Sequence, residues 1–309
     1  MRLSTDALPA RDRVALFQDE FGRRLTGSDV SASSNPRNPF RIRWSHVTGR
    51  RVGVTLADNA GFTLRRRDRR LRDGDDDFSY LMAVSGSVRW EQGDRRFVLL
   101  PGQGALVCHA TPHESWWTGS RIAAIRVPRS CLPDPGAADR AAGNRWESTH
   151  PLLKLLRAYR RSLWDEVEAH GELPAPSERN LIDLVAALAA TSAETARRTV
   201  RHALGPARVA AMREVLVRRC ADPDLGMAEV AAAVGVSERA GHLAFAAAGL
   251  RFGDCLAEAR LARVLARLRS GEAGRIIDIA FAAGFGDVSH FNRLFRRRFG
   301  MTPGEMRHG

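Results

Sequence analysis

The last third of the chain contains a weak internal repeat, which constrains the fold more than any other feature of the sequence. One copy runs from 227 to 237 and the other from 277 to 287. Each copy places a small alanine four residues before a glycine, as Ala231 and Gly235 and again as Ala280 and Gly284. The glycine permits a left-handed turn between two helices, and the alanine lets the next helix pack closely. The repeat therefore predicts two helix-turn-helix modules.

The segment after the second turn, from about 287 to 299, predicts an amphipathic helix. Its apolar face consists of Phe291, Leu294, Phe295 and Phe299. Its outward face consists of Ser289, His290, Asn292, Arg293, Arg296 and Arg297. Arginine can bond guanine through two hydrogen bonds, asparagine can do so with adenine, and histidine or serine can reach base edges or phosphates. We therefore expect this face to enter the major groove of double-stranded DNA, and we assign Asp287 to capping of the helix.

At these positions the chain resembles the AraC/XylS family of bacterial regulators. The matching residues are Ile279-Ala280, Gly284-Phe285, Ser289-x-Phe291, Arg293-x-Phe295-Arg296, Phe299-Gly300 and Thr302-Pro303. The resemblance extends over 205–309 and implies a sequence-specific, effector-responsive transcription activator that has RNA polymerase as a partner. It also implies that a connecting helix, here 252–270, places the two recognition helices in successive major grooves, roughly 34 Å apart along the DNA.

The first helix-turn-helix module departs from the family pattern. Gly241 stands where the family usually has leucine in the recognition helix, and Leu243 stands where it often has arginine. A glycine inside a helix costs about 0.5–1 kcal/mol relative to alanine, and the absent arginine removes a DNA contact. The remaining candidates for DNA contacts in this module are Ser237, Glu238, Arg239 and His242. We therefore expect the second module to carry most of the sequence discrimination.

The N-terminal half alternates short β-rich segments with turn residues. The expected strands are 42–47, 51–56, 62–67, 78–84, 87–92, 96–100 and 122–127. Turns are expected at Ser85-Gly86, Gly93-Asp94 and Pro101-Gly102, where glycine or proline supplies the backbone angles. Such spacing predicts a small all-β barrel or sandwich, and the layout resembles a cupin-like sensor barrel.

Two groups of side chains in this barrel could carry chemistry. His109, His113 and Glu114 are close in sequence, and imidazole and carboxylate suit iron, manganese or zinc. The tight His-x-His pair of cupin enzymes is absent, so a loop of solvated histidines is favoured, and we expect no metal, no cofactor and no catalytic residue. Trp116 and Trp117 are explained equally well as the lining of an effector pocket and as barrel core. The sequence does not identify the effector or its binding residues.

Between the barrel and the repeat, two amphipathic helices are expected. The first lies within 150–170, where apolar residues recur at three- and four-residue steps from Leu152 to Val167. Pro174 and Pro176 interrupt it, and the second helix has Ser177 as its expected N-cap. This helical hairpin either covers the barrel or leaves an apolar face for a homodimer.

Length and charge agree with this organisation. The chain has 309 residues, which favours two domains. We predict an α+β protein with a cupin-like barrel at 1–148, the hairpin and linker at 149–204, and an all-α DNA-binding domain at 205–309. The formal net charge of +13 attracts polyanions such as nucleic acid. The arginine-rich run 65–72 is interpreted as a solvated loop, with a phosphate-contacting patch as the alternative.

The expected location is the cytoplasm, because the chain has neither a run of about 18 apolar residues nor a signal peptide. No membrane partner is expected for the same reason. The rival hypothesis is an enzyme, either a cupin-type metal enzyme or a DNA-repair protein fused to a DNA-binding module. Repair by methyl transfer needs an activated cysteine, and Cys108 adjoins His109 without a Pro-Cys-His motif. A third hypothesis is an architectural protein that binds DNA without sequence preference.

Overall fold

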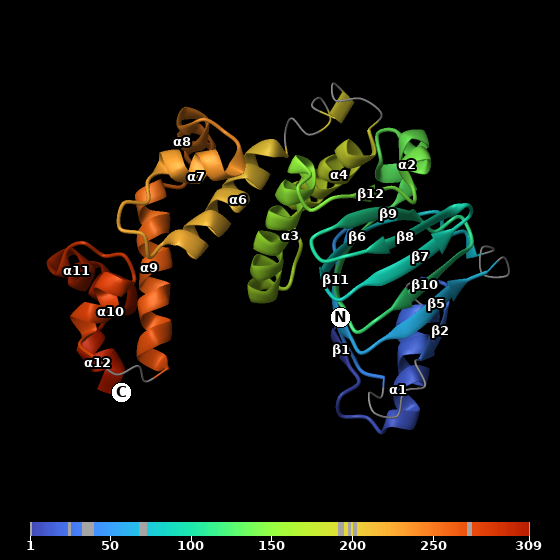
Figure 1. Ribbon diagram of the computed structural model, residues 1–309, viewed down its shortest axis with the longest axis horizontal. Coiled ribbons are helices and arrows are strands. Elements are labelled where there is room, and N and C mark those ends of the chain that lie inside the picture. Colours follow the sequence, from blue (N-terminus) through green and yellow to red (C-terminus); the bar gives the residue numbers. More distant parts are fainter. Residues whose placement is uncertain are drawn as a thin grey trace. The chain divides into compact units, whose positions relative to one another are not determined.

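The computed structural model describes residues 2–23, 26–32, 40–67, 73–190, 195–196, 199, 203–270 and 274–308. It separates into two compact units, Met1–Ala203 and Leu204–Gly309 (Figure 1). Positions 68–72 of the arginine-rich run lie outside the described residues. Within the described part of the chain, no helix is long and apolar enough to cross a membrane.

The N-terminal unit is built on two antiparallel sheets that face each other (Figure 1). The first sheet has the order β1 (Arg2–Ser4), β3 (Ile42–Thr48), β4 (Gly53–Asn59), β11 (Arg121–Val127), β6 (Phe78–Ser85), β9 (Gly104–Cys108) and β12 (Arg145–Trp146). The second has the order β2 (Asp29–Ala32), β5 (Phe62–Arg66), β10 (His113–Trp117), β7 (Val88–Gln92) and β8 (Arg95–Leu99). Buried and more exposed residues alternate along β5, β7 and β10, so every second side chain points between the sheets. The α+β fold with a cupin-like barrel is thereby confirmed.

Sequence reasoning missed several strands, and two of them, β9 and β10, contribute to the candidate site. β9 is buried at every position, so it lacks the alternation that marks a strand with one exposed face. β10 contains a histidine, a glutamate and a serine, which made it resemble a loop. It becomes a strand through pairing with β5 on one side and β7 on the other. The short strands β1, β2 and β12 were also missed.

The N-terminal helices close one end of the space between the sheets. α1 (Ala10–Phe17) continues directly into the π-helical segment η1 (Gln18–Arg23). Phe17 is fully buried, stacks on Phe21 with 4.7 Å between ring centroids, and meets Phe62 edge-on at 5.2 Å. These phenyl rings join the core that both sheets share.

The barrel is followed by the helices α2 (Pro135–Ala141), α3 (Pro151–His170) and α4 (Ala175–Ala189). α3 and α4 form the expected hairpin, but the expectation that Ser177 caps the second helix is wrong. α4 begins at Ala175 with Pro174 as its N-cap, three residues before the expected cap, and Pro176 fits its first turn because no N–H is needed there. Glu178, which is 1% exposed, accepts a hydrogen bond of 3.0 Å from the backbone N–H of Arg51. This bond ties α4 to the turn between β3 and β4.

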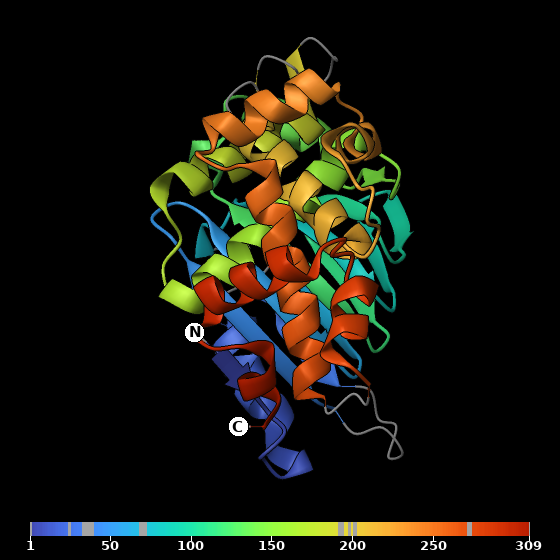
Figure 2. The ribbon, with the colours of Figure 1, turned by 90° about the vertical axis from the view of Figure 1, so that its left-hand side faces the viewer.

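The C-terminal unit is all-α (Figure 2). Its helices are α6 (Leu204–Arg219), α7 (Met227–Val234), α8 (Glu238–Ala247), α9 (Phe252–Arg269), α10 (Ile276–Ala282), α11 (Val288–Phe299) and α12 (Pro303–His308). α7 and α8 form the first helix-turn-helix module, α10 and α11 form the second, and α9 joins them. Leu256 of α9 packs into the core of the first module, whereas Leu261 and Val264 pack into the core of the second. One helix therefore belongs to both cores.

Both turns of the repeat have the conformation that the sequence predicts. Gly235 and Gly284 have positive φ angles of 79° and 97°, in the region that favours glycine. Ala231 and Ala280 are both buried, and each lies in the core of its own module. The prediction of two helix-turn-helix modules is confirmed.

Candidate DNA-binding surface and ligand cavity

The recognition helix of the second module, α11, is held in place by aromatic packing. Asp287 is its N-cap and accepts a hydrogen bond from the backbone N–H of His290, as expected. Phe291 and Phe295 are fully buried, with 5.7 Å between their ring centroids. Phe299 continues this row of rings at 4.6 Å from Phe295 but is only half-buried. Gly300 ends the helix in a left-handed conformation with φ of 75°.

The opposite face of α11 is open to solvent. Every residue predicted to face outward is exposed: Ser289, His290, Asn292, Arg293, Arg296 and Arg297. Arg293 donates a hydrogen bond of 3.0 Å to Nδ1 of His290, one turn earlier. Arg298 points elsewhere, because its Nε donates to Glu258 on α9 at 2.8 Å. α11 therefore carries a contiguous polar face and one arginine that serves its packing.

The recognition helix of the first module, α8, presents fewer polar groups. The hydroxyl of Ser237 caps the helix by accepting from the backbone N–H of Ala240 at 3.3 Å. Glu238, Arg239 and His242 are exposed. Leu243 is also exposed, to 60%. The four predicted contact residues thus lie at one exposed end of α8, and Leu243 follows them along the helix.

Gly241 has a packing reason that the sequence did not reveal. It is buried on the inner side of α8, and a methyl group in its place would lie 2.7 Å from Sδ of Met227 and 3.3 Å from Cβ of Ala231. The glycine therefore lets α8 approach α7 closely. The close packing of the two helices offsets part of the free-energy cost of a glycine inside a helix.

A junction joins the two modules at the end of α6. Arg260 of α9 donates to the backbone oxygens of Cys220 at 2.9 Å and Asp222 at 2.8 Å. These carbonyls follow the last turn of α6, where helices leave acceptors unpaired. Gly284, in the turn of the second module, packs against the same point, since a methyl group there would lie 2.3 Å from the oxygen of Cys220. The junction therefore restricts the orientation of one module relative to the other.

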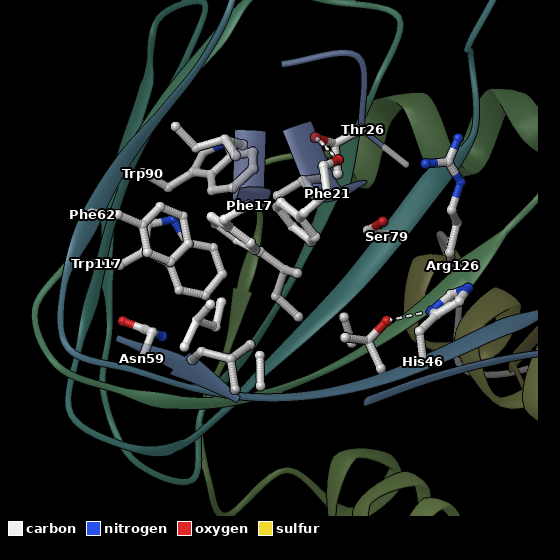
Figure 3. Close-up of a pocket in the computed structure, with 18 of the residues that line it drawn as sticks. Phe17, Phe21, Thr26, His46, Asn59, Phe62, Ser79, Trp90, Trp117 and Arg126 are labelled. Carbon is white, nitrogen blue, oxygen red and sulfur yellow. Dashed lines mark hydrogen bonds between the residues drawn. The ribbon is translucent and has the colours of Figure 1, made fainter. Parts of the chain in front are cut away.

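A cavity lies between the two sheets of the N-terminal unit (Figure 3). Both sheets, α1 and η1 contribute to its lining, which includes Phe17, Phe21, Ile42, His46, Thr55, Asn59, Phe62, Ser79, Trp90, His109, His113, Trp117 and Arg126. Its volume is about 70 Å³, and since one water needs roughly 10–15 Å³ on this measure, it can hold a compact molecule. Aromatic rings gather on one side, whereas Ser79, His46 and Arg126 lie on the other (Figure 3).

The interpretation of His109 and His113 as solvated loop residues is wrong. They are 4% and 5% exposed, and both line the cavity. Glu114 points to the opposite face of β10, because side chains alternate along a strand, and it pairs with Arg65. The three residues therefore do not converge. Among the described residues, no group of three or more His, Cys, Asp or Glu side chains could hold a metal ion.

The two neighbouring tryptophans separate in the same way. Trp117 lines the cavity and stacks on Phe62 with 5.0 Å between ring centroids. Trp116 lies on the outer face, where the guanidinium of Arg89 sits 4.7 Å from the centre of its ring. One tryptophan therefore belongs to the cavity and the other to the surface of the sheet.

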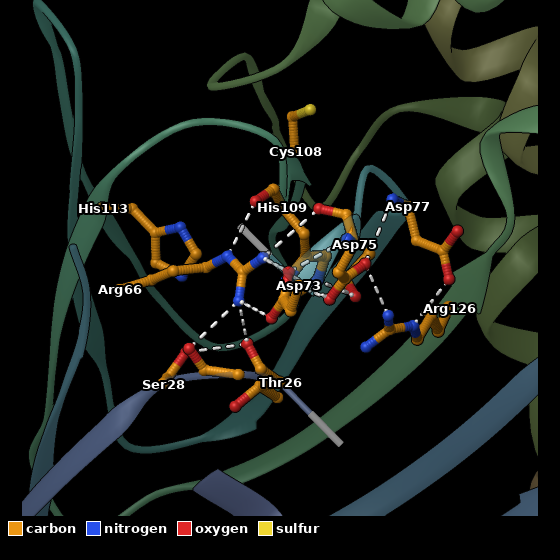
Figure 4. Close-up of polar contacts among 12 residues, drawn as sticks. Thr26, Ser28, Arg66, Asp73, Asp75, Asp77, Cys108, His109, His113 and Arg126 are labelled. Carbon is orange, nitrogen blue, oxygen red and sulfur yellow. Dashed lines mark hydrogen bonds and ion pairs between the residues drawn. The ribbon is translucent and has the colours of Figure 1, made fainter. Parts of the chain in front are cut away.

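Behind the polar end of the cavity lies a cluster of charged side chains that includes the buried Arg66 (Figure 4). Arg66 has a fully buried side chain, pairs with both carboxylate oxygens of Asp73 at 2.7 and 2.9 Å, and donates to the backbone oxygen of His109 at 2.8 Å. Arg126 donates to Asp75 at 2.6 Å and Asp77 at 2.9 Å. The interpretation of the arginine-rich run as a solvated loop is therefore wrong for Arg66.

Burial keeps the imidazoles of the cavity uncharged. It lowers the pKa of His46 and of His113 to about 4 and places the pKa of His109 well below its usual value. The positive charge of Arg126 adds to this effect at His46 and His109. Neutral imidazole offers one donor and one acceptor, so at neutral pH the cavity presents hydrogen-bonding groups without histidine charge.

Cys108 and Cys255 do not have the character that repair by methyl transfer needs. Burial raises the pKa of the Cys108 thiol and of the Cys255 thiol. A nucleophilic cysteine needs a lowered pKa, because the thiolate is the reactive form. These two residues therefore lack activation in this structure.

Comparisons with known proteins agree with this geometry. Residues 17–193 match the family model of an AraC-binding-like domain, and residues 230–309 match that of a helix-turn-helix domain. The transcriptional activator NphR of a Rhodococcus species is 27% identical over 297 residues, which covers 87% of this chain and 81% of that protein. The transcriptional activator RhrA of Rhizobium meliloti is 33% identical over 101 residues, which is 32% of each protein.

A solved structure shares the fold. The crystal structure of the AraC-like transcriptional activator CuxR superposes with a TM-score of 0.53 at 16% identity, over 92% of this chain and 100% of that one. Because NphR and RhrA are transcription activators, the enzyme hypothesis is not favoured.

Proposed function

This chain belongs to the AraC/XylS family of bacterial transcription regulators, and we propose the following roles for its two units. α8 and α11 enter successive major grooves of double-stranded DNA at one operator. A small-molecule effector in the barrel cavity changes how they engage it. The chain acts as a transcription activator, as its named relatives do, with RNA polymerase as its partner at the promoter.

The outward face of α11 is the observation that carries this proposal. Its polar side chains stand on a helix whose other face is fixed by buried phenylalanines. Such a helix fixes the positions of its outward side chains relative to one another. Recognition of bases in a groove requires such fixed positions. Asn292 and Arg293 are the residue types that bond adenine and guanine through paired hydrogen bonds.

The two modules contribute unequally. In α8 the hydroxyl of Ser237 is used for capping, which leaves Glu238, Arg239 and His242 for polar contacts. α11 therefore supplies most of the sequence discrimination. The junction at Arg260 supports a fixed spacing of the two recognition helices.

A homodimer is part of the proposal, because two copies would bring two DNA-binding units to one promoter. The helical hairpin lacks the apolar face that such a contact needs, since among the described residues no large apolar side chain of α3 or α4 is exposed. Analytical ultracentrifugation of the full chain, with and without operator DNA, measures whether such a dimer forms.

Selection of genomic DNA tests the proposed function. The purified full-length protein is mixed with genomic fragments in competing salt, and the retained fragments are sequenced. We expect one motif with two parts about one helical turn apart, roughly 10–10.5 base pairs. Retention of random fragments with a steep salt dependence would instead identify an architectural protein.

Two arginines of α11 provide a matched pair of variants. Arg293→Ala removes an outward side chain, whereas Arg298→Ala removes one that is bonded to Glu258. Loss of a bidentate base contact costs about 1–3 kcal/mol, so Arg293→Ala should weaken binding to the selected motif by about 5- to 150-fold and relax the preference at one base pair. Arg298→Ala should change neither quantity appreciably. Arg239→Ala should relax the preference less than Arg293→Ala does. Equal effects of the two α11 variants in a gel-shift titration would contradict this assignment.

A further inference from the structure

His113 lines the cavity and holds a buried hydrogen-bond acceptor. Its Nδ1 lies 3.2 Å from the carbonyl oxygen of Thr111, and since a carbonyl oxygen only accepts, Nδ1 carries the proton. Burial lowers the pKa of His113 to about 4, so the ring is neutral at physiological pH and Nε2 keeps its lone pair. Nε2 is buried and has no hydrogen-bond partner among the residues that the structure describes. A group that completes this site must donate a hydrogen bond.

Aromatic rings line the same cavity as this acceptor, and we call four of them the aromatic wall: Phe17, Phe62, Trp90 and Trp117. Trp90 stacks on the imidazole of His113 with 4.6 Å between ring centroids. The indole N–H of Trp117 is used, since it donates to Ser115 at 2.9 Å. That of Trp90 is buried without a partner in the described part of the chain. Flat walls of this kind favour a flat, apolar ligand body.

The charges around the cavity disfavour an ionic ligand. Arg126 is the charged side chain in the lining, and it is held by Asp75 and Asp77. The lining contains no aspartate or glutamate within the described residues, so an ammonium ligand would lie near Arg126 without a counter-ion. A carboxylate ligand could not bond Nε2 of His113, because both groups only accept hydrogen bonds. Burial of an unpaired charge is costly, and an uncharged ligand avoids this cost.

We propose that the cavity binds a small, uncharged aromatic molecule with one O–H or N–H group, such as a phenol, and that this group donates its hydrogen bond to Nε2 of His113. The ring of the ligand lies against the aromatic wall. The volume of about 70 Å³ suits a compact molecule of this kind. This inference rests on the proposed role of the cavity as the effector site, and it specifies the chemistry of the effector.

Calorimetric titration of the full-length protein with matched probes tests the proposal. Phenol carries the ring and the donor, anisole carries the same ring and oxygen without the donor, and benzoate carries a negative charge. Because a site built to bond a hydroxyl rejects the analogue that lacks it, phenol should bind about tenfold or more tightly than anisole. Benzoate should bind more weakly than either. Equal affinity for phenol and anisole, tighter binding of benzoate, or no binding of any probe would overturn the proposal.

A substitution at the acceptor tests the role of His113 itself. His113→Phe keeps a flat ring against Trp90 and removes Nε2, so the preference for phenol over anisole should disappear while the affinity for anisole stays the same. Trp116→Phe is the control, because Trp116 lies on the outer face of the same strand, and it should keep the wild-type preference. A His113→Phe protein that retains the preference overturns the assignment. If this variant does not fold, the probe series on the wild-type protein still decides whether the cavity requires a donor.

The outcomes separate this inference from the proposed function. A protein that selects one operator but shows no donor preference retains its DNA-binding role and loses the proposed effector chemistry. A protein that selects no operator fails the proposed function, whatever the probes show.

Discussion

At the scale of single residues, Leu243 is the departure from the family pattern with the clearest consequence. It is 60% exposed on α8, one turn after Arg239. A large apolar side chain gains nothing from exposure to water, but in the major groove apolar groups can contact the methyl group of thymine. The residue that replaces an arginine can therefore give the first module a preference for thymine.

Replacement of thymine by deoxyuridine in the first half of the selected operator measures this preference, because uracil lacks the methyl group. Burial of one such carbon contributes about 0.8 kcal/mol, so wild-type affinity should fall by about fourfold at one position. Leu243→Ala should bind the two operators equally. The same replacement in the second half of the operator serves as the control, since Leu243→Ala should not alter its effect. Wild-type protein that ignores the replacement throughout the first half would show that Leu243 does not read thymine.

At the scale of elements, the two turns of the repeat have different surroundings. A methyl group at Gly235 would meet no atom within 4 Å, whereas one at Gly284 would lie 2.3 Å from the backbone oxygen of Cys220. Both glycines have positive φ angles. The first turn therefore needs glycine for its backbone conformation alone, and the second needs it also for the junction with α6.

Alanine at each turn separates these two requirements. Gly235→Ala should destabilise the C-terminal unit by about 1–2 kcal/mol, the cost of a left-handed conformation for a residue with a side chain. Gly284→Ala should cost more, because the backbone of Cys220 must also move. Urea denaturation followed by far-UV circular dichroism measures both costs. Tryptophan fluorescence cannot report them, because all six tryptophans lie in the N-terminal unit, from Trp44 to Trp164. Equal costs would mean that the backbone at Cys220 accommodates the added methyl group without a further loss of stability.

At the scale of the whole molecule, the buried histidines make the stability of the N-terminal unit depend on pH. The pKa of His46 and of His113 is about 4 in the folded state, below the value of about 6.5 for an exposed histidine. Below about pH 6.5 the unfolded chain therefore binds more protons than the folded one. The free energy of unfolding decreases as the pH is lowered, until the folded-state pKa is reached. Asp75 acts in the opposite direction, because burial raises its pKa, but a single carboxyl opposes several imidazoles.

We therefore expect the N-terminal unit to lose stability between pH 7 and pH 5. The loss should approach about 1.4 kcal/mol per pH unit for each buried histidine at the acidic end of this interval. Tryptophan fluorescence during urea denaturation follows this unit selectively, since all six tryptophans belong to it. His113→Phe should reduce the dependence on pH. A denaturation midpoint that stays constant from pH 7 to pH 5 would show that these imidazoles are not buried in the neutral form.

The architecture of the C-terminal unit could be predicted from the sequence, because the signals there act within a few residues. A left-handed glycine, a capping aspartate at Asp287 and the helical spacing of Phe291 and Phe295 each specify local structure. The exposure of Asn292 and Arg293 followed from the same spacing, while their contacts with bases stay predictions. The strands of the barrel with clear alternation could be predicted for the same reason.

The cavity could not be predicted from the sequence, because its parts come from distant positions in the chain. β10 has the composition of a loop and is a strand only between β5 and β7. Arg66 looks like one member of a charged run, but Thr26, Asp73 and His109 together satisfy it in the interior. Whether His113 is solvated or buried with a free acceptor depends on which strands pack around it. The burial of these polar residues depends on long-range packing, which the local pattern around each of them does not specify.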